Sequence, residues 1–304
     1  MSKPLPGPVD FALLATLGAV WGGSFMLIKL ALVGFTPAQL TASRLTLAAV
    51  ILAAVALWRG EALRFSARDL TFIALVGFFG NAFPFVLISW GETTVDAGLA
   101  AILMGIMPLA TLVMAHVFAG EQTLNAPRIA GVCVGLAGLV ILVGPHVLGQ
   151  IGRQGLAQLA ILCAALSYTV NAILSKKLLH LPRRAAAAAI IGAGAAMTLV
   201  LTALEGGPAP VNVTAVSLFA VLLLALFPTA LATILVFVVL ERQGAGFFGL
   251  VNLLVPLFGV AWAFFVLGEV PGASALLALV LILGGIAITR VAPRRAPYPI
   301  QPGE

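Results

Sequence analysis

The stretch of sequence that decides the fold is GLAAILMGIMPLATLVMAHVFAGE, residues 98–121. It is apolar over a length that can cross a bilayer, and it carries Pro108 near its middle. A second stretch, GFFGLVNLLVPLFGVAWAFFVLGE, covers residues 246–269 and places Pro256 at the same internal position. Because both stretches also end in Gly-Glu, we infer that the second is a copy of the first.

The composition around these stretches indicates a protein of the lipid bilayer. Of the 304 residues, 62% are hydrophobic and only 9% are charged, whereas a soluble domain carries about 25% charged residues. A water-soluble core could not bury this much apolar surface, so lipid must be the main solvent. The net charge of +6 could indicate a nucleic-acid partner, and the positions of the basic residues decide that question below.

Apolar runs of about 20 residues recur between short polar or Pro/Gly-rich breaks. The first run is longer than the apolar core of a signal peptide, so we interpret it as a membrane helix. The sequence therefore predicts an all-α membrane protein of ten transmembrane helices. The expected spans are 10–32, 37–58, 70–90, 95–119, 126–145, 155–178, 185–204, 214–240, 244–267 and 271–291.

The basic residues test this count and give an orientation. With the N-terminus in the cytoplasm, thirteen lysines and arginines fall in cytoplasmic segments, and only Arg153 falls in a loop on the other side. This asymmetry follows the positive-inside rule, and one missed helix would destroy it. We therefore expect cytoplasmic N- and C-termini, a basic, proline-rich cytoplasmic tail at 292–304, and no nucleic-acid partner. The thirteen are Lys3, Arg59, Arg64, Arg68, Arg128, Lys176, Lys177, Arg183, Arg184, Arg242, Arg290, Arg294 and Arg295.

The similarity of the two opening stretches extends to the helices around them. The first and sixth predicted helices each carry an aromatic residue, then a small polar residue or an amide, then a lysine. The chain is therefore interpreted as two five-helix repeats, residues 1–147 and 148–291. The matching residues are Trp21, Ser24 and Lys29 in the first repeat and Tyr168, Asn171 and Lys176 in the second.

The odd number of helices in each repeat decides how the two repeats are oriented in the membrane. If the first repeat starts inside, the second must start outside, so the two repeats are inverted relative to each other. Inverted repeats are the architecture that many secondary transporters use for alternating access, with substrate bound near the midplane between them. We therefore expect a central cavity between the two halves.

At this point the sequence resembles a known group, the EamA family of the drug/metabolite transporter superfamily. The resemblance rests on AVWGGSFMLIKLAL (19–32), on TASRLTLAA (41–49) and on the Gly-Glu ends of the two opening stretches, and it covers roughly residues 10–291. It implies ten helices, cytoplasmic termini, a central cavity and export of small metabolites. Within the family, the sequence resembles the YddG-type bacterial exporters of aromatic amino acids.

Asparagines deep in the predicted spans are the first candidates for the site. They are Asn81, Asn171 and Asn252. A polar side chain in lipid must face the bundle interior or water, because its desolvation is otherwise costly. Each amide could line the cavity and bind a substrate, or could hydrogen-bond one helix to another.

Arg44 is the strongest charged candidate for the site. It lies about 10 Å below the predicted start of its span, at 1.5 Å rise per residue. It could anchor a substrate carboxylate, pair with Glu92 or Asp96, or snorkel to the interface. Lys29 is nearer the end of its span, where snorkelling is expected.

Aromatic rings could supply the apolar walls of the site. Trp21 and Tyr168 occupy equivalent repeat positions and could face each other across the cavity, or could pack in the core. Trp90 is expected at the membrane interface, where aromatic belts form. Three phenylalanines are candidates for the same cavity wall: Phe79, Phe83 and Phe227.

Prolines inside the spans are candidate hinges or static bends, because each removes a backbone donor. They are Pro84, Pro108, Pro228 and Pro256.

Carboxylates are absent from the middle of every predicted span. This argues against a lipophilic-cation antiporter and favours neutral, zwitterionic or anionic substrates. Glu121 and Glu269 are expected as structural carboxylates at helix ends, with a gate as the alternative. Cys133 and Cys163 are expected to be packing residues. The histidines, His116, His146 and His180, lie near ends or in loops, so we expect no metal site, no cofactor and no enzyme activity.

The sequence thus predicts a monomeric, multi-pass transporter of the bacterial inner membrane. Its expected small-molecule substrates for export are amino acids, above all hydrophobic or aromatic ones. Nucleosides, sugars and other neutral or anionic metabolites are the alternatives. A membrane-embedded lipid enzyme would need a cluster of catalytic side chains, and a channel would need rings of pore-lining polar residues; the sequence favours neither.

Overall fold

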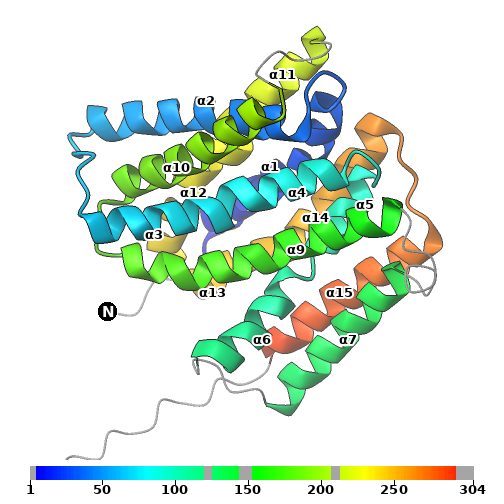
Figure 1. The fold of residues 1–304 in the computed structure, drawn as a ribbon. Helices are drawn as coiled ribbons and strands as arrows, with labels where there is room; N and C mark the ends of the chain where they lie inside the picture. Colours follow the sequence, from blue (N-terminus) through cyan, green and yellow to red (C-terminus); the bar gives the residue numbers. More distant parts are fainter. Residues whose placement is uncertain (1–4, 120–124, 144–152, 207–212, 292–304) are drawn as a thin grey trace, which may run out of the picture.

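The computed structural model describes residues 5–119, 125–143, 153–206 and 213–291, and every regular element in these ranges is a helix (Figure 1). The all-α prediction is therefore confirmed. The elements of the first half are α1 (Pro8–Ala31), α2 (Pro37–Trp58), α3 (Ala67–Gly77), η1 (Phe78–Ala82), α4 (Phe83–Gly91), α5 (Ala97–Met104), α6 (Met107–Ala119) and α7 (Ala126–Val143). Those of the second half are α9 (Arg153–Leu174), η2 (Ser175–Leu178), α10 (Arg183–Leu204), α11 (Ala215–Leu224), η3 (Ala225–Leu231), α12 (Ala232–Gln243), α13 (Ala245–Phe248), α14 (Val251–Trp262), η4 (Ala263–Leu267) and α15 (Ala273–Val291).

Within the described residues, eight helical stretches are long and apolar enough to cross a membrane. Two further apolar helices, Ala126–Leu142 and Ala273–Thr289, are shorter. Each of the ten expected spans overlaps one of these stretches. The repeat boundary at 147/148, Glu121, His146 and the tail at 292–304 lie outside the described residues.

Local sequence signals start several of these helices. Thr36 accepts a hydrogen bond from the Gln39 N–H at 3.2 Å, and the Gln39 side chain accepts one from the Thr36 N–H at 3.1 Å. Pro37 occupies the first position of α2, where its missing N–H is not needed. Ser66 and Asp69 form the same reciprocal pair at the start of α3.

Two of the long helices contain a widened turn beside a proline. The π segment η1 leads into Pro84 near the start of α4, and the π segment η3 contains Pro228. In η1 the Phe83 N–H bonds to the carbonyl of Phe78, five residues earlier. A proline has no N–H to donate in the regular hydrogen-bond pattern of an α-helix, and a widened turn accommodates the missing bond.

The two prolines of the opening stretches differ in local structure. The first stretch breaks between α5 and α6, and Pro108 is the second residue of α6, where a proline costs little. The second stretch breaks after α13, and Pro256 lies inside α14. The two prolines therefore match in sequence but not in their place in the helix.

Glycines bring α1 and α14 into direct backbone contact. A Cβ added to Gly22 would lie 2.7 Å from the backbone nitrogen of Gly259. A similar glycine contact joins α7 and α15, where a Cβ on Gly131 would lie 2.6 Å from the Gly285 carbonyl oxygen. Small residues at such contacts are what let membrane helices approach closely. Figure 1 shows α7 and α15 side by side, grouped with α6 below the other helices.

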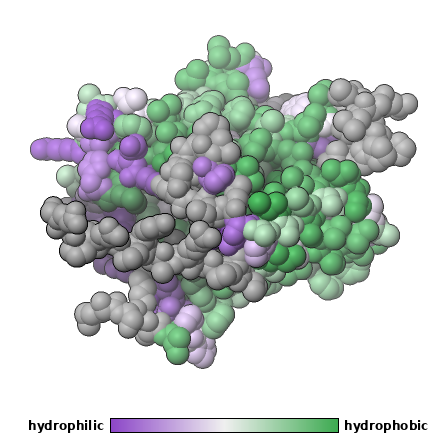
Figure 2. All heavy atoms as spheres, turned by 90° about the horizontal axis from the view of Figure 1, so that it is seen from below, coloured by the Kyte–Doolittle hydropathy of each residue, from purple (hydrophilic) through white to green (hydrophobic). Residues whose placement is uncertain are grey.

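The two ends of the helix bundle differ in charge. We call the end with the turn between α4 and α5 the 92–96 end, and the other the opposite end. Figure 2 shows hydrophilic residues gathered on the side where α2 ends and α3 begins in Figure 1, which is the opposite end. The ion pairs among the described residues also lie there: Asp10–Arg242, Glu61–Arg184, Arg183–Glu241 and Asp69–His180.

Cys133 on α7 and Cys163 on α9 are exposed on the helix surfaces. Their prediction as packing residues is wrong. In helices that are apolar on every side, a small apolar residue carries no signal of which face points inward.

Candidate binding site

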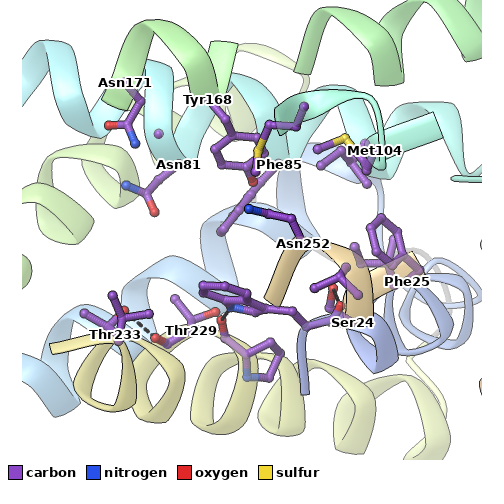
Figure 3. A pocket seen from close by; sticks show the side chains of 18 of the residues that line it. Ser24, Phe25, Asn81, Phe85, Met104, Tyr168, Asn171, Thr229, Thr233 and Asn252 are labelled. Carbon is purple, nitrogen blue, oxygen red and sulfur yellow. Dashed lines mark hydrogen bonds between the residues drawn. The ribbon is translucent and has the colours of Figure 1, made fainter. Parts of the chain in front are cut away.

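One cavity of about 380 Å³ lies among the helices of both halves of the chain (Figure 3). Its walls come from α1, α2, η1, α4, α9, η3, α12, α13 and α14, with the break between α5 and α6 on one side. Pro228 and Pro256 line it, whereas Pro84 and Pro108 do not. All six side chains that the sequence singled out for substrate contact line this cavity: Trp21, Arg44, Asn81, Tyr168, Asn171 and Asn252.

Arg44 is the fixed charge of the cavity. Its side chain is only 5% exposed. Its Nε donates to the hydroxyl of Thr229 at 2.7 Å, and its guanidinium lies 4.0 Å from the ring centroid of Phe85. The Thr229 hydroxyl in turn donates to the Leu224 carbonyl at 2.8 Å, across the widened turn of η3.

The alternative interpretations of Arg44 are wrong. Snorkelling fails because the side chain is buried in the cavity wall. The expected pairing with Glu92 or Asp96 is absent, since no ion pair among the described residues includes Arg44. A buried guanidinium held on one edge by a hydroxyl keeps its other donors for a further partner.

The three asparagine amides face the cavity with hydrogen-bonding capacity to spare. Asn252 donates to the Gly249 carbonyl at 3.2 Å, and the side-chain oxygen of Asn171 accepts from Ser175 at 3.3 Å. The amide of Asn81 makes no hydrogen bond within the described part of the chain. Figure 3 shows Asn81 and Asn171 together on one side of the cavity and Asn252 between its walls. Their alternative role as links between membrane helices has no supporting hydrogen bond in the described ranges.

The aromatic candidates divide into those that line the cavity and those that do not. The Trp21 indole donates to the Pro228 carbonyl at 3.2 Å, and its ring meets Phe248 edge-on at 6.1 Å between centroids. Tyr168 lies opposite Thr229 in Figure 3. Their placement at the cavity agrees with the sequence-based expectation.

The predicted phenylalanine wall is wrong. Phe79, Phe83 and Phe227 do not line the cavity, and Phe83 and Phe227 are 36% and 44% exposed on the outside of the bundle. In helices that are apolar on every side, a phenylalanine gives no signal of the face it occupies. The phenylalanines that do line the cavity are Phe25, Phe85, Phe237 and Phe248.

Sequence reasoning also missed the hydroxyl groups of the site. Ser24, Thr229 and Thr233 line the cavity, and Thr229 is the residue that holds Arg44. Hydroxyl residues are common in membrane helices because they can bond their own backbone, so their presence alone is a weak signal. The one available clue was the position of Thr229 directly after Pro228.

Lys29 closes the turn at the 92–96 end. Its ammonium group donates to the carbonyls of Glu92 and Val95, at 2.8 Å each. The lysine satisfies backbone acceptors that the end of α4 leaves open. That Lys29 snorkels to the interface stays a prediction.

Glu269 holds the same turn from the second half of the chain. Its carboxylate accepts hydrogen bonds from the backbone N–H groups of Ala97 at 3.1 Å and Gly98 at 2.9 Å. These are the first N–H groups of α5, where a negative charge is favourable. The two halves are thus fastened together at the 92–96 end, a contact that fits both expected roles of Glu269, a structural carboxylate and a gate.

Among the residues that the structure describes, no group of three or more His, Cys, Asp or Glu side chains could hold a metal ion. The site is therefore described by its guanidinium, amides, hydroxyls and rings.

The sequence model of the EamA-like transporter family matches residues 11–144 and, separately, residues 155–291. The chain belongs to this family. The cavity described above thus belongs to an EamA-family protein and is lined by residues of both matched segments.

Curated relatives agree with this membership. A "Probable terminal-alkyne amino-acid exporter" of Streptantibioticus cattleyicolor is 33% identical over 282 residues, which cover 91% of this chain and 92% of the relative. A "Probable amino-acid metabolite efflux pump" of Salmonella typhimurium is 28% identical, covering 88% of this chain and 90% of the relative. An "Uncharacterized inner membrane transporter YedA" of Escherichia coli K12 is 27% identical, covering 73% and 71%.

A solved crystal structure of a protein with 21% sequence identity superposes with a TM-score of 0.67, over 92% of this chain and 97% of that one. This likeness supports the helical fold and carries no statement about a substrate.

Proposed function

We propose that this EamA-family chain is a secondary transporter that exports hydrophobic or aromatic amino acids across a bacterial inner membrane. The observation that carries the proposal is the buried guanidinium of Arg44 in a cavity with aromatic walls. A planar guanidinium binds a carboxylate with two parallel hydrogen bonds. A cavity of this size, mostly apolar with a few converging polar groups, suits a small molecule.

The other side chains of the cavity fit the rest of such a substrate. The Asn252 side-chain oxygen has no hydrogen-bond partner within the described ranges and can accept a bond from an α-amino group. The rings of Trp21, Phe85 and Tyr168 offer stacking surfaces for an apolar or aromatic side chain. The names of the two amino-acid exporters among the relatives support this substrate class.

The proposed architecture is ten spans in two inverted repeats, 1–147 and 148–291, followed by a cytoplasmic tail at 292–304. The two separate family matches support a duplication. The basic residues at the opposite end support its cytoplasmic location, so the 92–96 end faces outward. The protein works as a monomer by alternating access, and the fastened 92–96 end corresponds to an outward-closed state.

Transport in proteoliposomes tests this function. Vesicles that contain the purified protein and are preloaded with unlabelled amino acid should accumulate radiolabelled phenylalanine or leucine faster than protein-free vesicles. Labelled nucleosides and sugars, run in parallel, are the alternative substrates. If no amino acid exchanges faster than the leak, the proposal fails.

Replacing Glu269 by Gln should loosen the 92–96 end. The neutral amide loses the charge that favours the first N–H groups of α5, which costs roughly 1 kcal/mol, or about fivefold in a conformational equilibrium. In a background without Cys133 and Cys163, a cysteine at Ser24 in the cavity should then react about fivefold faster with an impermeant thiol reagent added from outside.

The control is Glu205→Gln, an exposed glutamate after α10, which should leave the labelling rate unchanged. Equal rates in the Glu269 variant and the parent protein would contradict an outer closure that depends on this carboxylate.

A further inference from the structure

Two polar side chains of the cavity take no part in amino-acid binding as proposed above. They are Asn81 on η1 and Asn171 on α9, and both line the cavity. Figure 3 shows them on the same side of it, the side on which Thr233 also lies. We call these two asparagines the amide pair. A polar group inside a protein is costly without a partner, so the unused groups of the pair need one from a ligand or from water.

Tight packing between η1 and α9 holds the amide pair in place. A Cβ added to Gly80 would lie 2.6 Å from the side-chain oxygen of Asn171, so the carboxamide occupies the room that the glycine leaves free. One turn earlier on α9, the Ser167 hydroxyl donates to the Phe79 carbonyl at 2.7 Å. Because η1 itself carries Asn81, these contacts fix both amides relative to each other. Groups that are fixed in advance lose little freedom when a ligand binds.

The unused hydrogen-bonding groups of the pair are mainly donors. The side-chain oxygen of Asn171 accepts from the Ser175 hydroxyl at 3.3 Å, and its NH₂ group meets no acceptor within the described ranges. Asn81 makes no hydrogen bond to any residue that the structure describes, so both ends of its amide are open. An α-amino group only donates and cannot satisfy the two NH₂ groups, whereas a carbonyl oxygen can.

The amide pair lies about one helical turn from the level of Arg44. The Phe85 ring, 4.0 Å from the guanidinium, comes four residues after Asn81, and Tyr168 comes three residues before Asn171. All of these residues line the cavity, so α4 and α9 each present a ring and an amide on one face. Because α4 ends at the 92–96 end and α9 ends at the opposite end, both amides are displaced from the rings in the same direction, toward the opposite end.

The cavity is apolar on the other side of this level. Ile88 comes three residues after Phe85 and lines the cavity toward the 92–96 end, together with Phe25 and Met104. Figure 3 shows Phe25 and Met104 across the cavity from Asn81. The guanidinium, at the level of Phe85, therefore has apolar walls on one side and the amide pair on the other.

We propose that the amide pair binds an acyl group on the substrate nitrogen, and that the cavity is built for amino acids whose α-nitrogen is acylated. The inference rests on the proposed function, since it places the substrate carboxylate at Arg44. The apolar side chain then lies toward Ile88, the amide N–H donates to the Asn252 oxygen, and the acyl carbonyl accepts from the amide pair.

The dimensions of such a substrate agree with this arrangement. In an N-acylated amino acid, the amide nitrogen is two bonds from the carboxylate carbon, and the acyl oxygen is two bonds further on. With a hydrogen bond at each end, that length spans about one helical turn, roughly 5 Å. A free amino acid has no acceptor at this distance from its carboxylate on the nitrogen side, so it leaves the NH₂ groups of the pair to water.

Binding of small carboxylates to the purified protein, measured by calorimetry at neutral pH, tests the proposal. N-acetyl-L-phenylalanine carries the acyl amide, whereas 3-phenylpropanoate has the same ring, chain and negative charge without it. The acetylated ligand should bind on the order of tenfold tighter, through two or three added hydrogen bonds. 2-Acetoxy-3-phenylpropanoate keeps the acyl carbonyl but has an ester oxygen in place of the N–H, so its affinity should lie between these two.

L-Alanyl-L-phenylalanine distinguishes the two sources of an acyl group. If dipeptides are the substrates, its affinity should match or exceed that of N-acetyl-L-phenylalanine. If simple acyl groups are, the dipeptide should bind more weakly than the acetylated ligand, because its ammonium group then lies beside the donors of the amide pair. Both results support recognition of the acyl amide.

Variants show whether the amide pair carries the preference. Asn81→Leu and Asn171→Leu keep the size of the side chain and remove its hydrogen bonds, so each should weaken N-acetyl-L-phenylalanine by about threefold or more. Gly80→Ala keeps both amides but displaces that of Asn171, and should act in the same direction. Binding of 3-phenylpropanoate should stay unchanged in all three, which controls for folding. The matched control is Asn125→Leu, at the start of α7 and outside the cavity, which should leave both affinities unchanged.

Two results would overturn the inference in distinguishable ways. If N-acetyl-L-phenylalanine and 3-phenylpropanoate bind equally, or if the preference survives both leucine variants, the amide pair does not bind an acyl group. Exchange of free L-phenylalanine in proteoliposomes would then still support the proposed function. If the protein binds neither these carboxylates nor a free amino acid, the proposed function fails, and this inference fails with it.

Discussion

Replacing Arg44 by Met should weaken amino-acid binding by roughly 100-fold, because a substrate carboxylate would enter a buried site with no charge to meet it. The substitution keeps the length and apolar stem of the side chain and removes the guanidinium that Thr229 and Phe85 hold in place. Calorimetry with L-phenylalanine and exchange in proteoliposomes measure the loss.

Two controls keep this result specific. Arg59→Met removes an exposed arginine just beyond the end of the same helix and should leave binding unchanged. The thermal stability of the Arg44 variant should stay level or rise, because removing a buried charge is often neutral or stabilising. Binding within threefold of the wild type would show that Arg44 does not anchor the substrate.

Replacing Gly22 by Val should lower the melting temperature by about 5–10 °C. A Cβ at this position would lie 2.7 Å from the Gly259 nitrogen and 2.8 Å from the Val255 carbonyl oxygen, so α1 and α14 must move apart. Overpacking of this kind costs on the order of 3 kcal/mol, and a few degrees per kcal/mol is typical for a chain of this size. Thermal unfolding in detergent, followed by tryptophan fluorescence, measures the change.

The matched control is a helical glycine with space around it. A Cβ at Gly192 in α10 would meet nothing within 4 Å, so Gly192→Ala should be neutral or slightly stabilising. Equal melting temperatures for the Gly22 variant and the wild type would show that the contact between α1 and α14 can widen without cost.

The sequence could predict the helices and part of the site for one physical reason. In lipid, a polar side chain deep in an apolar helix must turn inward. This rule predicted that Arg44 and the three asparagines face the interior, and they line the cavity together with Trp21. It needs no knowledge of the fold beyond the length of each apolar run.

In the same lipid environment, the positions of other residues could not be predicted. In helices that are apolar on every side, phenylalanines and cysteines give no signal of the face they occupy, so Phe83, Phe227 and Cys163 were misplaced. The partners of Lys29 were not predictable because they are backbone carbonyls of a distant turn. Glu92 looked like an ordinary residue at a helix end, and only tertiary packing buries it.

The widened turns also have a consequence for how this family can vary. A π turn holds one residue more than an α turn, so η1 and η3 correspond to single-residue insertions in otherwise regular helices. Losing that residue would rotate the following helix by about 100° and would turn Phe85 or Thr233 away from the cavity. In alignments, relatives with a one-residue gap at 78–82 or 225–231 should therefore have cavities with different chemistry and different cargo.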